Sequence, residues 1–313
     1  MREQGVDLIV LIYSVDVANV EQLLDGHTID LALHKDNYFE IESSTPYQPH
    51  GNDVFLTEPG VAAIIELVWQ KGKPESLQLH WQKRYLNEFD KLPQVARQIA
   101  GYTARLNRLL AQPIGITSTP IDCRRLQLRT RENAFGNFLA DSIKKYTGAD
   151  IALINSGAIR GDKLYPADHS LTRRDIADIL PYRAEILVLD VTGQQIIDAF
   201  ENSFSSIERV KGRFLQVSGL KVVYNSSHAT GKRVVSVQVN HHDIIADQHY
   251  QLATTDYLAQ GGDGYSVFSN SPRVNNNKQV IRLLSDIAIN QIIKQKIISP
   301  EIESRLTDLA NAN

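Results

Sequence analysis

The stretch IALINSGAIRGD, residues 151–162, decides the fold of the C-terminal part of this chain. Four apolar residues precede Asn155 and predict a buried strand, after which small residues lead to Arg160. In α/β proteins ligands lie at the carboxyl ends of strands, where a residue such as Gly157 lets backbone N–H groups approach a ligand. The stretch predicts a ligand site at Asn155, Gly157 and Arg160, and a plain strand-to-loop turn with a solvated arginine is the alternative.

Helices and strands alternate around this stretch without a simple repeat. An apolar stripe before it predicts a helix that ends at Gly148. After it, Thr172 and Asp175 resemble a capping box for a helix that Pro181 ends. A strand over 185–191, a helix over 193–204 and several Val-rich strands follow, and C-terminal helices are expected over 279–309.

The first hundred residues show a different rhythm. Residues 5–12, 17–24 and 29–33 predict a strand, a short helix and a strand, as in a βαβ unit. Further strands are expected on both sides of the turn KGKPES, residues 71–76, and residues 92–110 predict a long helix with one apolar face. We take this helix as the domain boundary.

Composition narrows the class of protein. The chain has 313 residues, 42% of them hydrophobic, which is enough for one full domain and part of another. Lysine and arginine (33) nearly balance aspartate and glutamate (36), so no global field would attract nucleic acid or a membrane. The apolar run at residues 8–13 is too short to cross a bilayer and lacks a cleavage site, and the single cysteine, Cys123, excludes an internal disulfide.

Two arginines precede the helix that ends at Gly148. In RRLQLRTREN, residues 124–133, an extended backbone would place Arg125 and Arg129 on one side, where both guanidinium groups could bind one anion near a helix N-terminus. A solvated basic stretch is the alternative, since Arg124 and Arg131 lie there too.

Two tyrosines and an aspartate suggest a site that binds the hydroxyls of a sugar and stacks on an aromatic ring of the ligand. In TDYLAQGGDGY, residues 255–265, Asp263 lies among glycines and could accept hydrogen bonds from a vicinal diol, and Tyr257 offers a stacking face. Tyr182 is a second aromatic residue, on a loop after Pro181. A hairpin turn, and tyrosines that only fill core or surface, are the alternatives.

Taken in order, these segments resemble the C-terminal domain of the 5′-nucleotidase family from about Thr117 to Phe268. The landmarks are RxxxR, FGN, INSGAIR, LPY, GRFLQVSGL and LAQGGDGY. By this resemblance the phosphate end is lined by Arg125, Arg129 and Arg160, with Asn155 and Gly157 nearby. Tyr182 and Tyr257 fall where the family has phenylalanines that sandwich the base, and Asp263 falls on the carboxylate that binds ribose hydroxyls.

The first 85 residues resemble the end of the family's metallophosphoesterase domain. The family's two divalent metal ions are held there by histidines and acidic residues, whereas Tyr13, Asp36 and Tyr38 stand at or near the matching positions of this chain. The other ligands would precede Met1. A substitute site of His27, His34 and Asp36 is a loose cluster, and His241 and His242 read as hairpin-turn residues.

We therefore expect an α/β (α+β) protein whose residues 1–85 are a truncated remnant of an α/β sandwich, 86–113 a linker helix and 114–313 a layered α/β/β/α domain with mixed sheets. The resemblance implies that this chain is the part of a nucleotide phosphohydrolase that binds nucleoside phosphates or nucleotide sugars. We expect it to have no catalytic residue, metal ligand or cofactor of its own, and weak or no activity alone. A non-catalytic nucleotide sensor or scavenger is the alternative, and a third hypothesis gives residues 1–85 a structural role only.

Partners and location follow from the same resemblance. We expect no nucleic acid and no membrane among the partners, and a separate chain that supplies the catalytic domain stays open. The family is typically periplasmic or extracellular, but this chain shows no signal peptide, so its compartment stays open.

Overall fold

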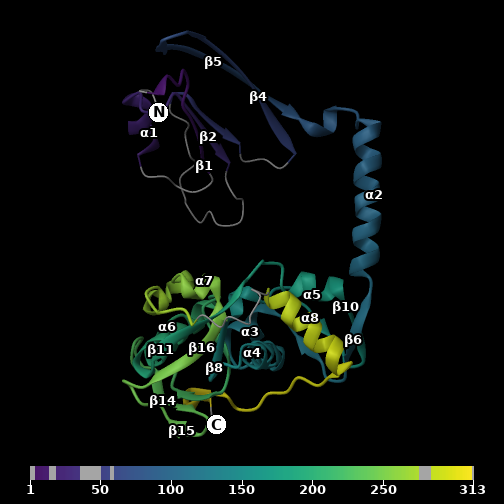
Figure 1. Ribbon diagram of the computed structural model, residues 1–313, viewed down its shortest axis with the longest axis vertical. Coiled ribbons are helices and arrows are strands. Elements are labelled where there is room, and N and C mark those ends of the chain that lie inside the picture. The colour runs from purple at the N-terminus through teal and green to yellow at the C-terminus, as the bar shows by residue number, and fades with distance from the viewer. Residues whose placement is uncertain (1–3, 14–18, 36–50, 57–59, 275–282, 312–313) are drawn as a thin grey trace. The chain divides into compact units, whose positions relative to one another are not determined.

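The computed structural model describes residues 4–13, 19–35, 51–56, 60–274 and 283–311 (Figure 1). The chain divides into two compact units, Met1–Ala100 and Gly101–Asn313. Within the described ranges, no helix combines the length and the apolar composition that a membrane crossing requires.

The first unit contains a small parallel sheet and a hairpin. Strands β1 (Val10–Tyr13), β2 (Leu31–Lys35) and β3 (Asp53–Leu56) pair in parallel in that order, and helix α1 (Val20–Asp25) connects the first two. The expected βαβ unit is confirmed, although its first strand begins later, at Val10. Strands β4 (Val61–Gln70) and β5 (Lys73–Tyr85) form an antiparallel hairpin, and a short 3-10 helix, η2 (Leu86–Glu88), follows.

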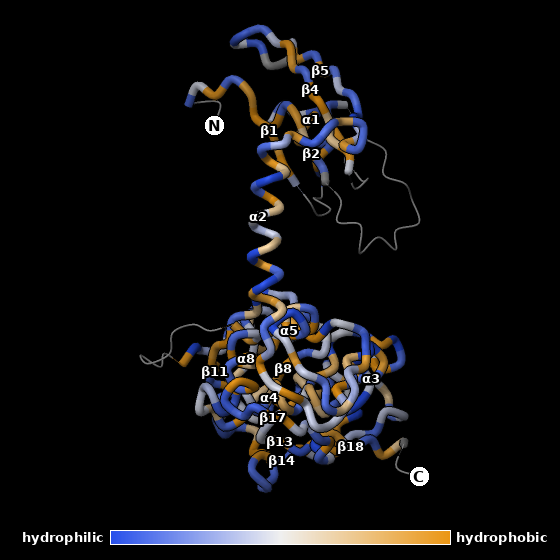
Figure 2. Tube along the Cα trace, turned by 90° about the vertical axis from the view of Figure 1, so that its right-hand side faces the viewer, coloured by the Kyte–Doolittle hydropathy of each residue, from blue (hydrophilic) through white to orange (hydrophobic). Residues whose placement is uncertain are grey.

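The predicted long helix is confirmed as α2 (Pro93–Leu110). Hydrophobic and hydrophilic residues alternate along its length (Figure 2). Proline at the first helical position suits a helix start, because the N–H group that proline lacks would have no partner inside the helix.

The second unit is organised around a four-stranded mixed sheet in the order β11 (Ile186–Thr192), β16 (His249–Thr255), β8 (Ile151–Asn155), β12 (Leu215–Ser218). Strand β8 pairs in parallel with β16 and antiparallel with β12, and β16 pairs antiparallel with β11. Strand β8 is buried at all five positions, as its apolar run predicted.

The two faces of β8 belong to different hydrophobic clusters. Ala152 and Ile154 face a cluster that includes residues of α4 (Ala134–Thr147), α5 (Arg173–Ile179) and α8 (Leu284–Gln295). Ile151 and Leu153 face a cluster with α6 (Gly193–Phe204) and a second sheet. That sheet has the order β15 (His242–Asp243), β14 (Val234–Val239), β13 (Leu220–Tyr224), β18 (Leu306–Asp308). The expected α/β fold with mixed sheets is confirmed.

Local signals place the ends of three helices. The Asn133 side chain accepts a hydrogen bond from Gly136 N at 3.0 Å and begins α4, which ends at Gly148 in a left-handed conformation. Thr172 and Asp175 form the predicted capping box of α5, which stops two residues before Pro181. A second capping box begins α6.

The expectation of C-terminal helices over 279–309 is only partly right. Helix α8 ends at Gln295, where Lys296 takes a positive φ of 65°. After it, β17 (Ile297–Ile298) pairs with β6 (Pro113–Thr117), which also pairs with β10 (His169–Thr172), and β18 pairs with β13. These residues form strands and not helices because β6 and β13 offer them edges to pair with. The unit also contains the short elements β7 (Ile121–Asp122), β9 (Leu164–Tyr165) and η7 (Leu309–Asn311).

Candidate functional site

The two arginines of RxxxR lie on a helix and not on an extended segment. Helix α3 (Arg125–Thr130) begins at Arg125, so the extended backbone that would place both arginines on one side is not formed. A separation of four residues also places two side chains on one face of a helix, so Arg125 and Arg129 still share a side. The Asp162 carboxylate accepts a hydrogen bond from Arg125 N at 2.8 Å, which satisfies a free donor at the helix start.

Gln216 fixes the other end of α3. Its side-chain amide, fully buried on β12, donates to Leu128 O and Arg131 O at 2.9 Å each, and its oxygen accepts from Asn133 N at 2.9 Å. One side chain thus ties carbonyls at the end of α3 to Asn133, the residue that caps the next helix. Sequence reasoning used this segment only as a landmark and missed Gln216, although an amide inside an apolar strand pattern is a signal for a polar staple.

Arg129 is a buried cation. Its side chain is 8% exposed, and its Nη1 donates to Val210 O at 3.3 Å. Burial, followed by the positive charges of Arg125 and Arg160, lowers the pKa of Arg129 below its ordinary value, and Asp263 acts in the opposite direction. The hypothesis of a solvated basic stretch is therefore wrong for Arg129, and Arg125 and Arg160 both lie within electrostatic range of it.

The end of β8 meets a second loop at a backbone contact. Gly157, in the short 3-10 helix η3 (Ser156–Ala158), donates its N–H to Gly212 O at 2.8 Å. A Cβ added to Gly212 would lie 2.9 Å from Gly157 Cα, so Gly212 has no room for a side chain, and a Cβ added to Gly157 would lie only 3.2 Å from Gly212 Cα. The same loop carries Val210, which accepts from Arg129, and follows η4 (Ile207–Arg209). Sequence analysis missed this loop as a wall of the site.

Asp263 joins the strand end to the glycine-rich turn. Asn155, 3% exposed, donates through Nδ2 to Asp263 Oδ2 at 2.7 Å, and Tyr257 Oη donates to Asp263 Oδ1 at 3.1 Å. Tyr257 lies on α7 (Asp256–Ala259), and Asp263 on η5 (Gly262–Gly264), which η6 (Ser266–Phe268) follows. The turn does not join two paired strands, so the hairpin alternative is wrong.

Tyr182 and Arg160 form a second contact in the same region. The guanidinium carbon of Arg160 lies 5.4 Å from the centre of the Tyr182 ring, within the range of a cation–π interaction. Tyr182 is 52% exposed and Tyr257 is 49% exposed, so neither ring fills the core. Through Arg129 and Asp263, the structure brings all eight predicted site residues into one region of the second unit.

At the end of β1, Tyr13 stands at or near a position that the resemblance gives to a metal ligand, and it contacts residues of β2 and β3. Tyr13 Oη donates to Asp53 Oδ2 at 2.8 Å, and the Tyr13 ring stacks on His34 with 4.3 Å between ring centres. Asp36 and Tyr38 lie outside the described residues. In the part of the chain that is described, His, Cys, Asp and Glu nowhere gather in threes that could hold a metal ion.

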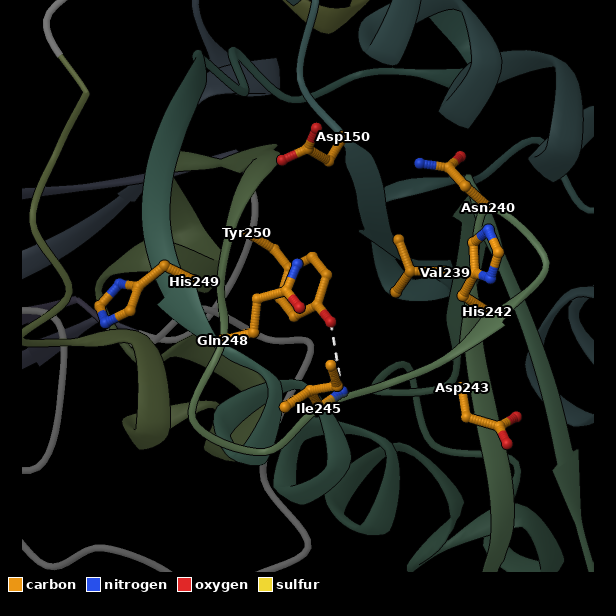
Figure 3. A pocket seen from close by; sticks show the side chains of 9 residues that line it. All are labelled: Asp150, Val239, Asn240, His242, Asp243, Ile245, Gln248, His249 and Tyr250. Atoms are coloured by element: carbon orange, nitrogen blue, oxygen red, sulfur yellow. Dashed lines mark hydrogen bonds between the residues drawn. The ribbon is translucent and has the colours of Figure 1, made fainter.

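A cavity of about 420 Å³ lies at the opposite end of β8, next to Asp150. Figure 3 shows Tyr250 and Gln248 on one side of it and His242 and Asn240 on the other. Asn240 and His241 form the turn between β14 and β15, which confirms the hairpin assigned to the two histidines, with His242 already in β15.

Comparison with known proteins identifies the family of the second unit. The 5′-nucleotidase C-terminal domain family matches residues 113–270. The chain is 29% identical to the trifunctional nucleotide phosphoesterase protein YfkN of Bacillus subtilis, in an alignment that covers 94% of this chain and 20% of that protein. It is 26% identical to human 5′-nucleotidase, over 68% of this chain and 40% of that protein. It thus spans less than half of these relatives.

Solved structures show the same fold at low identity. The 5′-nucleotidase precursor from Thermus thermophilus aligns with a TM-score of 0.61 at 23% identity, over 98% of this chain and 65% of that one. A putative 5′-nucleotidase from Staphylococcus aureus, solved with alpha-ketoglutarate, aligns with a TM-score of 0.68 at 15% identity, over 98% and 65%. With its family segment covering half of the sequence, this chain belongs to the 5′-nucleotidase C-terminal domain family.

Proposed function

We propose that the second unit binds nucleoside phosphates. Arg125, Arg129 and Arg160 bind the phosphate, Asp263 binds ribose hydroxyls with Asn155 and Gly157 beside it, and the rings of Tyr182 and Tyr257 bind the base. The chain is then the nucleotide-holding part of a nucleotide phosphohydrolase, in line with the 5′-nucleotidase names of its relatives.

One observation carries this proposal, the poorly satisfied cation of Arg129. A guanidinium has five N–H donors, and burying such a charge is costly without compensation. Arg129 is 8% exposed, has one carbonyl partner at 3.3 Å and has two cationic neighbours. Within the described ranges, none of the three arginines forms an ion pair with a carboxylate. A phosphate would supply both the charge and the acceptors that this cluster lacks.

Isothermal titration calorimetry of the full chain with AMP, ADP and UDP-glucose tests the binding. Removing a charged hydrogen-bond donor, as in Arg129→Met, should weaken binding about ten- to hundredfold. Arg124→Met is the matched control, because Arg124 lies in the same segment, is exposed and pairs with Asp122 at 2.6 Å. The proposal fails if none of the three ligands releases or absorbs heat, or if Arg129→Met binds as well as Arg124→Met does.

A non-catalytic nucleotide-binding module is the second candidate. It is favoured by Tyr13, which stands at or near a metal-ligand position by the resemblance and instead donates a hydrogen bond to Asp53 and stacks on His34. Release of phosphate from AMP by the purified chain, measured with and without added Mg²⁺ or Mn²⁺, separates the candidates. Metal-dependent turnover would contradict this second candidate, and binding without turnover would support it.

A further inference from the structure

The Tyr257 hydroxyl closes a hydrogen-bonded ring with a single residue. It accepts from Asp263 N at 3.1 Å and donates to Asp263 Oδ1, also at 3.1 Å. The other carboxylate oxygen, Oδ2, accepts from Asn155 Nδ2 at 2.7 Å. Each oxygen thus has one donor from the protein, which fixes the rotation of the carboxylate and leaves each oxygen a lone pair for a further donor.

The backbone of this turn is held in a conformation that needs support. Asp263 takes φ 53° and ψ 21°, in the left-handed region, between Gly261 at φ 89° and Gly264 at φ 85°. A non-glycine residue there costs free energy unless its surroundings hold it. Asn202 Nδ2 donates to Asp263 O at 3.2 Å, and the Tyr257 hydroxyl accepts from Asp263 N, so two side chains hold the strained residue.

The phenol ring itself is fixed by close packing. A Cβ added to Gly262 would lie 2.5 Å from Cε2 and Cζ of Tyr257, so the ring lies directly against the backbone of the turn. The ring and the turn therefore position each other, with the hydroxyl within hydrogen-bond distance of Asp263. A phenylalanine could keep the ring in this place but could not hold the carboxylate.

We propose that the Tyr257 hydroxyl is a positioning group that sets a preference for ribose over 2′-deoxyribose, an inference that rests on the proposed binding of nucleoside phosphates. Ribose presents two adjacent hydroxyls to the carboxylate of Asp263, and 2′-deoxyribose presents one. A carboxylate fixed in advance can accept from both hydroxyls without first losing rotational freedom. A carboxylate that is free to rotate must lose this freedom when it binds, which weakens binding of the two ribose hydroxyls more than binding of the single hydroxyl of 2′-deoxyribose.

Calorimetric titration of the full chain with AMP and with 2′-deoxy-AMP tests the inference. The quantity is the ratio of the dissociation constant of 2′-deoxy-AMP to that of AMP. Tyr257→Phe should lower this ratio about three- to tenfold, the value of one hydrogen bond, chiefly by weakening AMP. Tyr182→Phe is the matched control, because it also deletes one phenol hydroxyl from a half-exposed ring; its effects on the two ligands should be equal, which keeps the ratio.

A second variant connects the hydroxyl to the carboxylate. Asp263→Asn should lower the ratio, and adding Tyr257→Phe to it should lower the ratio no further, because the hydroxyl acts through the carboxylate. Far-UV circular dichroism checks that each variant is folded. A wild-type ratio near one, or an unchanged ratio in Tyr257→Phe, overturns the inference and leaves nucleotide binding standing, whereas a wild-type chain that binds neither ligand overturns both.

Discussion

Replacing Glu132 with glutamine should strongly destabilise the second unit. The Glu132 carboxylate is 5% exposed and accepts four hydrogen bonds. Oε1 accepts from Asn137 Nδ2 at 2.6 Å and Glu303 N at 2.7 Å, and Oε2 accepts from Arg305 N at 2.7 Å and Leu306 N at 3.2 Å. These bonds hold the chain just before and at the start of β18.

The size of the effect follows from the number of donors. A glutamine has one oxygen in place of two, so in either orientation two of the four donors lose their acceptor and face an NH₂ group. An unsatisfied buried donor costs about 1–3 kcal/mol, so Glu132→Gln should lower the free energy of unfolding by about 2–6 kcal/mol. Glu303→Gln is the matched control, because that side chain is 57% exposed and its ion pair with Arg305 should contribute less than about 1 kcal/mol.

Urea unfolding followed by far-UV circular dichroism measures the change. Both tryptophans, Trp69 and Trp81, lie in the first unit, so their fluorescence reports that unit separately. A loss below about 1 kcal/mol in Glu132→Gln, or a loss equal to that of Glu303→Gln, would refute the reasoning from the four donors.

Three further predictions follow from single residues. Gly262→Ala would place a methyl group 2.5 Å from the Tyr257 ring and should weaken AMP binding about five- to hundredfold in calorimetry; unchanged affinity would contradict the packing. Burial raises the pKa of the Cys123 thiol from 9.0 to about 12, so at pH 8 Ellman's reagent should react with it only after unfolding, and stability should fall as the pH rises from 9 toward 12; rapid labelling of the native chain would count against this. Burial alone would raise the pKa of Asp175, but hydrogen bonds from Thr172, together with the hydrogen bond and charge of His169, outweigh it and lower the pKa below 3.8. The stabilisation is therefore present above pH 3.8 and lost below it, so Asp175→Asn should cost about 1 kcal/mol at pH 7 and nothing in strong acid, and an equal loss at both pH values would rule this out.

Elements with strong local signals were predictable from sequence. The buried strand before Asn155, the end of α4 at Gly148 and the capping box at Thr172 all depend on residues within a few positions of one another. The family landmarks named eight candidate site residues, and the structure brings the segments that carry them together.

The elements that sequence did not predict share a physical cause, because residues distant in the sequence stabilise them. Helix α3 has only six residues, too few for a periodic signal, and its ends are stabilised by Asp162 and by Gln216, 37 and 88 positions from their partners on α3. Strands β17 and β18 are short and take their pairing from β6 and β13. The loop at Gly212 has no chemical group that predicts its place, because its role depends on a backbone contact with Gly157.

The hydrogen bond between Asn155 and Asp263 has a consequence for the time course of folding. It joins residues 108 positions apart, and the contact of Arg129 with Val210 joins residues 81 apart. Contacts between such distant positions require a long loop to close, which costs entropy before the contact stabilises the chain, and they tend to form slowly. We therefore expect the candidate site to be among the last parts of the unit to form. Under the proposed function, a nucleotide added during refolding would then bind only chains that have already completed the fold.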